Sequence, residues 1–144
     1  MYLIGKSMVK IRPMTAPDVD SVLSMDWAEI PEKEMVRSQR GGRLDASFIA
    51  ELEGVLIGFV LARIIYVGRP MTGVCQLNLI AVRPDQRKKG VAAILLDQLQ
   101  RHCQARGIGS VRALVDESDR RLREYFERAG FKPSSVINYD KPAQ

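Results

Sequence analysis

The chain between residues 82 and 91 constrains the fold more than any other part of the sequence. An almost wholly apolar run, MTGVCQLNLIAV, stops just before Pro84, and such a run is typical of a central strand covered on both faces. Four basic residues follow within seven positions, and after Gly90 the apolar residues recur at helical spacing. A strand, a short basic loop and a long helix in this order predict an α/β protein whose helix packs on a sheet.

The other segments supply further strands and helices. Residues 9–13 alternate as a strand does, and Thr15 with Asp18 three residues later indicates the first turn of a helix. Residues 46–68 are typical of two strands joined by a tight turn, which predicts a hairpin. The remaining expected elements are a short helix at 31–40, a strand at 110–115, a helix at 119–130 and one or two closing strands at 131–141.

The expected elements follow the order β-α-α-β-β-β-α-β-α-β, which predicts a mixed, mostly antiparallel sheet with helices on both faces. The fold class is therefore α/β, of the α+β mixed kind. At 144 residues the chain is expected to form one domain, residues 1–144. Because Met8 is a possible alternative start, residues 1–7 are interpreted as a dispensable extension.

The cysteines and the hydropathy of the chain indicate in which cellular compartment the protein is expected. Cys75 and Cys103 lie inside apolar patterns and lack the spacing of metal ligands, so we expect reduced core residues in a cytoplasmic protein and no metal site. No apolar run approaches the roughly 20 residues that a membrane span needs. We therefore expect no membrane partner.

The basic loop before the helix suggests an anion site. A net charge of +5 and a pI near 9.5 favour an anionic partner. Cations at a helix N-terminus are unfavourable on their own, but a bound phosphate would reverse the sign of that interaction. Gly90 has no Cβ and would let the backbone approach a phosphate closely. The alternative is a solvated basic loop, and neither the Walker pattern nor the dinucleotide pattern of glycines is present.

Two motifs resemble one known family. LIAVRPDQRKKGVAAILLDQLQRHCQARG is similar to the acyl-CoA-binding signature of the GCN5-related N-acetyltransferase (GNAT) family, a strand ending AV-x-P followed by [QR]-x-x-G-x-[GA] and a helix. DRRLREYFERAGF resembles the family's following helix. The resemblance implies a GNAT-like acyl-CoA N-acyltransferase fold and acetyl-CoA as cofactor. It also implies an enzyme that moves the acetyl group to an amine of a small molecule or protein by direct attack.

The resemblance also implies roles for individual residues. Main-chain amides of residues 87–92 would hold the CoA pyrophosphate, and residues 80–82 would pair with the pantetheine arm. An amide near Leu79 or Ile80 would polarise the thioester carbonyl, because a fixed N–H aimed at developing negative charge stabilises a transition state. The cofactor-binding residues expected on this basis are Leu79, Ile80, Ala81, Val82, Arg87, Lys88, Lys89, Gly90, Val91, Ala92, Asp119 and Phe126.

The catalytic acid is where the sequence departs from the family. Phe126 occupies the position of the frequent catalytic tyrosine, and Tyr125 is its neighbour, about 100° away around the helix. Tyr125 either reaches the sulfur from a rotated helix or packs in the core while the thiolate leaves without an enzymic acid. Asp116 is the first candidate for the base, because the C-terminal end of a strand is a common site position in open α/β sheets. The other candidates are Glu117, Glu51 and Glu53.

The last expectations concern the acceptor amine, the partners and the competing functions. The resemblance implies that the acceptor amine would be met by the first two helices, near Trp27, Glu29, Glu32 and Glu34. The three glutamates suit a cationic amine or form a solvated helix face. A homodimer is possible, and nucleic acid is an unlikely partner. The competing hypotheses are a basic nucleic-acid-binding module and a GNAT-fold protein that binds acetyl-CoA without catalysis. His102 is interpreted as a surface or core-edge residue rather than a catalytic one.

Overall fold

The computed structural model describes residues 2–4, 7–25, 36 and 44–144. The chain divides into two compact units, Met1–Leu114 and Val115–Gln144, and each is described by itself. Most of the short helix predicted at 31–40 and all four residues expected near the acceptor lie outside the described residues. The expectation of one domain stays a prediction.

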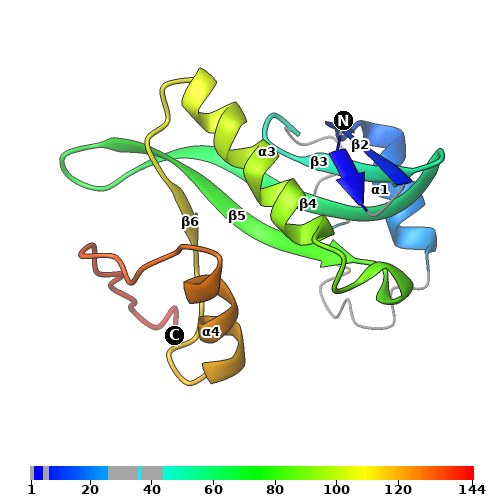
Figure 1. Cartoon of the computed structure of the whole chain (residues 1–144). Helices are drawn as coiled ribbons and strands as arrows, with labels where there is room; N and C mark the ends of the chain where they lie inside the picture. Colours follow the sequence, from blue (N-terminus) through cyan, green and yellow to red (C-terminus); the bar gives the residue numbers. More distant parts are fainter. Residues whose placement is uncertain (1, 5–6, 26–35, 37–43) are drawn as a thin grey trace. The chain divides into compact units, whose positions relative to one another are not determined.

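The first unit is built on one mixed sheet (Figure 1). In the described part of the chain the sheet has six strands in the order β1-β2-β3-β4-β5-β6. Neighbouring strands are antiparallel except β5 and β6, which are parallel, so the predicted mixed, mostly antiparallel sheet is confirmed. The strands are β1 (Tyr2–Ile4), β2 (Ser7–Pro13), β3 (Phe48–Leu52), β4 (Val55–Val67), β5 (Thr72–Val82) and β6 (Val111–Ala113).

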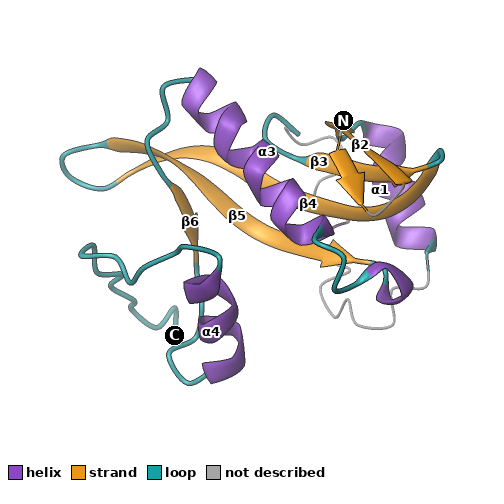
Figure 2. Ribbon diagram, viewed as in Figure 1, coloured by secondary structure: helices purple, strands orange, loops and turns teal. Residues whose placement is uncertain are grey.

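Helices cover both faces of this sheet (Figure 2). The core beside α1 (Ala16–Ser24) contains Val19 and Ile49. The next residue toward the start of β3, Phe48, meets the ring of His102 on α3 (Val91–Ala105) at 5.3 Å between centroids. Because successive strand residues point to opposite faces, α1 and α3 lie on opposite sides of the sheet. The expectation of helices on both faces is confirmed for this unit.

The buried face of α3 differs by one residue from the expected stripe. The helical spacing of the sequence predicts a buried stripe made of Ala92, Leu95, Leu96, Leu99 and Cys103. Four of these residues are buried as predicted, but Ala92 is partly exposed and Val91 is buried in its place. Val91 lies one helical turn before Leu95 and continues the same line of contacts with the sheet. The first turn of α3 is therefore fastened to the sheet by a side chain at its very first residue.

Both ends of the chain differ from the expected element order. Tyr2–Ile4 form an additional edge strand, with Tyr2 opposite Val9 on β2. In the second unit, α4 (Arg120–Arg128) is present as predicted, but residues 131–141 contain no strand, so the expected closing strands are wrong. Pro133 lacks an N–H for a ladder, and Ser134 instead accepts a local hydrogen bond from the Val136 N–H.

None of the helices in the described ranges is long and apolar enough to cross a membrane.

Candidate cofactor-binding site and catalytic residues

The second half of strand β5 has one open edge. On one side β5 pairs with β4 as far as Val82, opposite Gly58. On the other side β6 pairs with β5 only at Cys75, Gln76 and Leu77. Among the described residues, no strand continues this pairing from residue 78 to residue 82. A chain with amide groups could therefore add to β5 along this edge as another strand would.

A bulge decides which amides face the open edge. Leu61 lies opposite Leu79, but Ala62 lies opposite Leu77, so Asn78 is an extra residue on β5. Before the bulge, the Cys75 N–H points toward β6, where it donates to the Ser110 carbonyl. After the bulge the Arg83 N–H points toward β4 and donates to the Ile57 carbonyl at 2.8 Å. Because strand residues alternate between edges, the main-chain groups of Ile80 and Val82 face the open edge, whereas those of Leu79 and Ala81 face β4.

The loop from β5 to α3 ends in a turn with unusual backbone angles. Pro84–Gln86 form a short 3-10 helix, and then Lys88 and Gly90 have φ values of +63° and +87°. Gly90 caps α3 and provides no side-chain acceptor, so the first amides of α3 have neither an intrahelical nor a side-chain capping partner. Successive N–H groups in such a turn form a concave anion-binding site. This donor set fits a pyrophosphate group.

The turn is tied to the end of β5. The Arg87 Nε donates to the Val82 carbonyl oxygen at 3.2 Å. Lys88 and Lys89 are exposed beside Gly90, and Lys89 Nζ lies 3.4 Å from the Gln86 Oε1. A Cβ at Gly90 would meet no atom within 4 Å, so the space over the turn is open. The residues predicted to bind the pantetheine arm and those predicted to bind the pyrophosphate thus lie at the two ends of the short loop between β5 and α3.

The second unit holds the expected catalytic residues and two expected cofactor ligands. The Asp116 carboxylate accepts hydrogen bonds from the Ser118 N–H at 2.8 Å and from its hydroxyl at 2.5 Å, which lowers the pKa of this exposed group. A lowered pKa makes a weaker base. The Asp119 carboxylate caps α4 by accepting the Leu122 N–H at 3.1 Å. The roles predicted for both aspartates stay predictions.

Tyr125 and Phe126 are half-buried on α4 and contact each other edge to face, with centroids 5.2 Å apart. Phe126 also contacts Phe131 at 5.0 Å. Burial raises the pKa of Tyr125, which keeps its hydroxyl protonated at neutral pH. Tyr125 therefore has the protonation state that a general acid requires, while Phe126 has a packing role in this unit.

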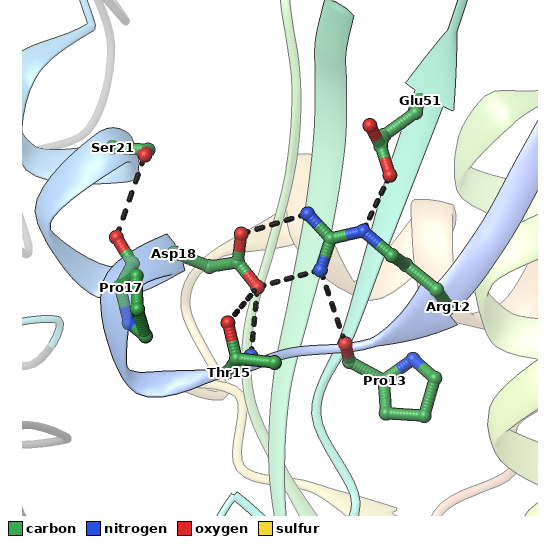
Figure 3. A network of polar contacts seen from close by, with 7 residues as sticks. All are labelled: Arg12, Pro13, Thr15, Pro17, Asp18, Ser21 and Glu51. Carbon is green, nitrogen blue, oxygen red and sulfur yellow. Dashed lines mark hydrogen bonds and ion pairs between the residues drawn. The ribbon is translucent and has the colours of Figure 1, made fainter. Parts of the chain in front are cut away.

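Two of the remaining base candidates, Glu51 and Glu53, lie in the first unit, and Figure 3 shows Glu51; the third, Glu117, lies in the second unit. Glu51 on β3 forms an ion pair with the Arg12 guanidinium, which occupies the carboxylate. Glu53 lies in the β3–β4 turn with a φ of +50°. His102 packs against Phe48 at the edge of the core, as expected, and Cys75 and Cys103 are buried and free, as expected. Sequence patterns missed the bulge, although the polar residue Asn78 inside an apolar run was a signal for it.

Among the described residues, an open strand edge leads to a helix start with uncapped amides, an arrangement that fits an acyl-CoA, whose extended amide chain ends in a diphosphate. The model of the acetyltransferase (GNAT) family matches residues 16–131, and the chain belongs to this family. The match confirms the resemblance, the fold and acetyl-CoA as cofactor. The predicted enzyme class, an acetyl-CoA-dependent N-acetyltransferase, is also confirmed.

Particular relatives agree with this assignment. A curated relative, the mycothiol acetyltransferase of Propionibacterium freudenreichii subsp. shermanii, is 27% identical over 128 residues, 88% of this chain. The chain spans 35% of the length of that relative. The structure of AAC(6')-Iy in complex with the bisubstrate analog CoA-S-monomethyl-acetylneamine is 27% identical, with a TM-score of 0.74 over 95% of this chain and 100% of that chain. A ribosomal-protein-alanine N-acetyltransferase from Brucella melitensis biovar Abortus 2308 shares the fold at 20% identity, with a TM-score of 0.72 over 94% of this chain and 99% of that chain.

Proposed function

We propose that this chain binds acetyl-CoA along the open edge of β5 and transfers the acetyl group directly to the amine of a small cationic molecule. The observation that carries the proposal is that two sets of main-chain hydrogen-bonding groups follow each other directly: those along the open edge of β5 and those of the turn at the start of α3. The open edge begins at Asn78, and the turn at Lys88–Gly90 follows Val82, to which Arg87 ties it by a side-chain hydrogen bond. An extended amide chain that ends in a diphosphate matches both sets at once.

Each residue set has a defined task in this proposal. Acetyl-CoA, when bound, supplies the activated acetyl group. The amides from Arg87 to Ala92 would hold the pyrophosphate, mainly those from Lys88 onward, because the Arg87 N–H also donates to the Pro84 carbonyl at 3.5 Å. The main chain of Val82 would pair with the pantetheine arm. The Ile80 amide, rather than that of Leu79, faces the open edge after the bulge and would be the donor to the acyl carbonyl. A fixed donor at that position stabilises negative charge on the carbonyl oxygen without reorganisation.

Proton transfer is assigned to the second unit. The Tyr125 hydroxyl donates a proton to the leaving sulfur, which its raised pKa supports because the group is protonated before the reaction. Asp116 accepts a proton from the acceptor ammonium, directly or through water, and so exposes the lone pair of the amine. The lowered pKa of Asp116 keeps it ionised at neutral pH, at the cost of basicity.

The acceptor is proposed from the similar proteins. AAC(6')-Iy was solved with an analog that joins CoA to an acetylneamine, and the curated relative is a mycothiol acetyltransferase. Both names refer to small molecules, which supports a small-molecule amine over a protein N-terminus. The free cysteines are consistent with a reducing compartment such as the cytoplasm. A homodimer stays a prediction.

Titration calorimetry with CoA tests the cofactor site. Gly90→Glu places a carboxylate and a strained φ at the start of α3, and we expect the Kd for CoA to rise about tenfold or more, ~1.4 kcal/mol. Gly107→Glu is the matched control, because Gly107 has a similar φ of +73° and equally open space at the other end of α3. No binding of CoA to the unmodified chain, or equal losses in both variants, would refute the proposal.

The acceptor is tested by release of the CoA thiol across a panel of amines. We expect amino sugars and other small polyamines to raise thiol release above the acceptor-free rate. A peptide with a free N-terminal alanine serves as the protein-type acceptor, and we expect it to leave the rate unchanged. A peptide that accelerates release more than every small amine would contradict the proposed acceptor class.

A further inference from the structure

Gly58 lies where three features of the first unit meet. It is opposite Val82, at the end of the paired part of β4 and β5. It also adjoins the irregularity at which β3 and β4 shift register, because Ala50 lies opposite Gly58 and Glu51 lies opposite Leu56. On the face of the sheet covered by α3, the space next to Gly58 is filled by the first turn of that helix.

The atoms closest to Gly58 belong to the two parts of the candidate cofactor site, strand β5 and the start of α3. A Cβ built on Gly58 would lie 3.1 Å from the Ala81 carbonyl oxygen, 3.2 Å from Val91 Cγ1 and 3.4 Å from Leu95 Cδ1. Ala81 belongs to the strand that offers the open edge, and Val91 is the first residue of the helix that offers the amide turn. The missing side chain therefore lets these two parts of the site approach each other.

The reason for glycine at position 58 is space. Its φ lies outside the left-handed region, so an alanine there would meet no backbone strain. Val91 and Leu95 are almost completely buried, at 1% and 0% exposure, and cannot swing away into solvent. Because buried side chains are close-packed, a methyl group at position 58 must displace the Ala81 carbonyl on β5, the Val91 side chain at the start of α3, or both, by a few tenths of an ångström.

We propose that Gly58 is a positioning residue for the cofactor, one that sets the spacing between the open edge of β5 and the first turn of α3. The inference rests on the proposed function, in which a single ligand spans both parts. A ligand held at two points is sensitive to the distance between them, whereas a ligand held at one point is not. Gly58 touches neither part of the ligand and acts through Ala81 and Val91.

This role is tested by comparing the binding of CoA with the binding of a CoA fragment. We expect Gly58→Ala to raise the Kd for CoA about five- to tenfold in titration calorimetry. The fragment 3′-phospho-ADP, which engages the α3 turn alone, should bind the variant within about twofold of the unmodified chain. Gly58→Ala/Val91→Ala should recover part of the CoA affinity, because the second change removes Val91 Cγ1, one of the two atoms that the new methyl group would meet most closely; the other is the Ala81 carbonyl oxygen.

Two further glycines provide matched controls. Gly73→Ala is equally crowded, since its Cβ would lie 3.0 Å from Tyr66 and 3.1 Å from Ile108, but those contacts lie away from the proposed ligand path. Gly109→Ala meets no atom within 4 Å. We expect both variants to bind CoA like the unmodified chain.

The outcomes separate the possibilities. Unchanged CoA affinity in Gly58→Ala overturns the inference and leaves the proposed function standing. Equal losses for CoA and for 3′-phospho-ADP, or no recovery in the double variant, also overturn it, because they indicate general damage to α3. If the unmodified chain binds no CoA, the proposed function itself fails. A loss confined to whole CoA and partly reversed by Val91→Ala establishes Gly58 as a positioning residue.

Discussion

Arg12 on β2 holds Asp18 on α1 with two nearly parallel hydrogen bonds, from Nη1 to Oδ2 at 2.6 Å and from Nη2 to Oδ1 at 2.8 Å (Figure 3). Asp18 also accepts the Thr15 N–H at 2.7 Å and the Thr15 hydroxyl at 2.8 Å. The remaining guanidinium nitrogen, Nε, forms an ion pair with Glu51 on β3. One guanidinium therefore fixes the start of α1 to two strands, and a bidentate pair of this kind is stronger than an ordinary hydrogen bond.

This pairing predicts a dependence of stability on pH. The Arg12 guanidinium lowers the pKa of Asp18 from 3.8 to about 2, with a further contribution from Thr15. Because the folded pKa is below the unfolded one, the stabilisation is complete above about pH 4 and is lost as the pH falls through about 2. The shift corresponds to about 2 kcal/mol at neutral pH, since the Asp18 side chain is only 10% exposed.

Asp18→Asn isolates the charge at nearly constant shape. We expect it to lower the free energy of unfolding by about 2 kcal/mol at pH 7, measured by urea denaturation, and by much less near pH 2. Asp85→Asn is the comparison, because it breaks an exposed ion pair with Arg83 at 3.1 Å that is worth about 1 kcal/mol or less. If both variants lose the same free energy of unfolding at pH 7, the Arg12–Asp18 pair stabilises the fold no more than an exposed ion pair does.

The N-terminal segment is predicted to contribute to stability. Tyr2 belongs to β1, and its hydroxyl donates to Asp97 on α3 at 3.2 Å, so the segment joins the sheet edge to the helix. We expect Tyr2→Phe to cost about 1 kcal/mol by the loss of that hydrogen bond, and removal of residues 1–7 to cost more. Thermal unfolding of both variants measures this. A melting temperature unchanged by the deletion would support the interpretation of residues 1–7 as dispensable.

Tyr125 is predicted to act in the chemical step. We expect Tyr125→Phe to lower kcat about 100-fold with little change in KM for acetyl-CoA, because it removes the proton donor and keeps the ring. Steady-state thiol release measures both constants. Tyr139→Phe is the control, since Tyr139 is 89% exposed and lacks such packing. If kcat is unchanged, the thiolate leaves without an enzymic acid and Tyr125 serves only in packing.

The two cysteines are predicted to react slowly in the folded chain. Burial raises the pKa of the Cys75 and Cys103 thiols, and each is at most 2% exposed. Because the thiolate is the reactive form, we expect little iodoacetamide labelling at pH 8 in native conditions and full labelling of both in guanidinium chloride. Mass spectrometry counts the labels. Rapid native labelling at either cysteine would contradict its place in the core.

The elements that were predicted correctly are those with a strong local pattern. The stripe of α3, the alternation around the β3–β4 turn and the pair Thr15 and Asp18 each express a period or a cap within a few residues. The closing strands were wrong because a strand also needs a partner, and apolar residues such as Ile137 remain 70% exposed. β1 was missed because a three-residue strand is too short to show a period.

The sequence by itself determined the family, the long helix and the basic glycine turn at its start, since these depend on residues that are neighbours in the chain. Tertiary structure alone decided that Ile80 rather than Leu79 faces the open edge, and that Gly58 admits Val91 to the sheet. The physical reason is that both depend on how β4 is registered against β5. Register is set by hydrogen bonds and packing between residues far apart in sequence, which no local pattern records.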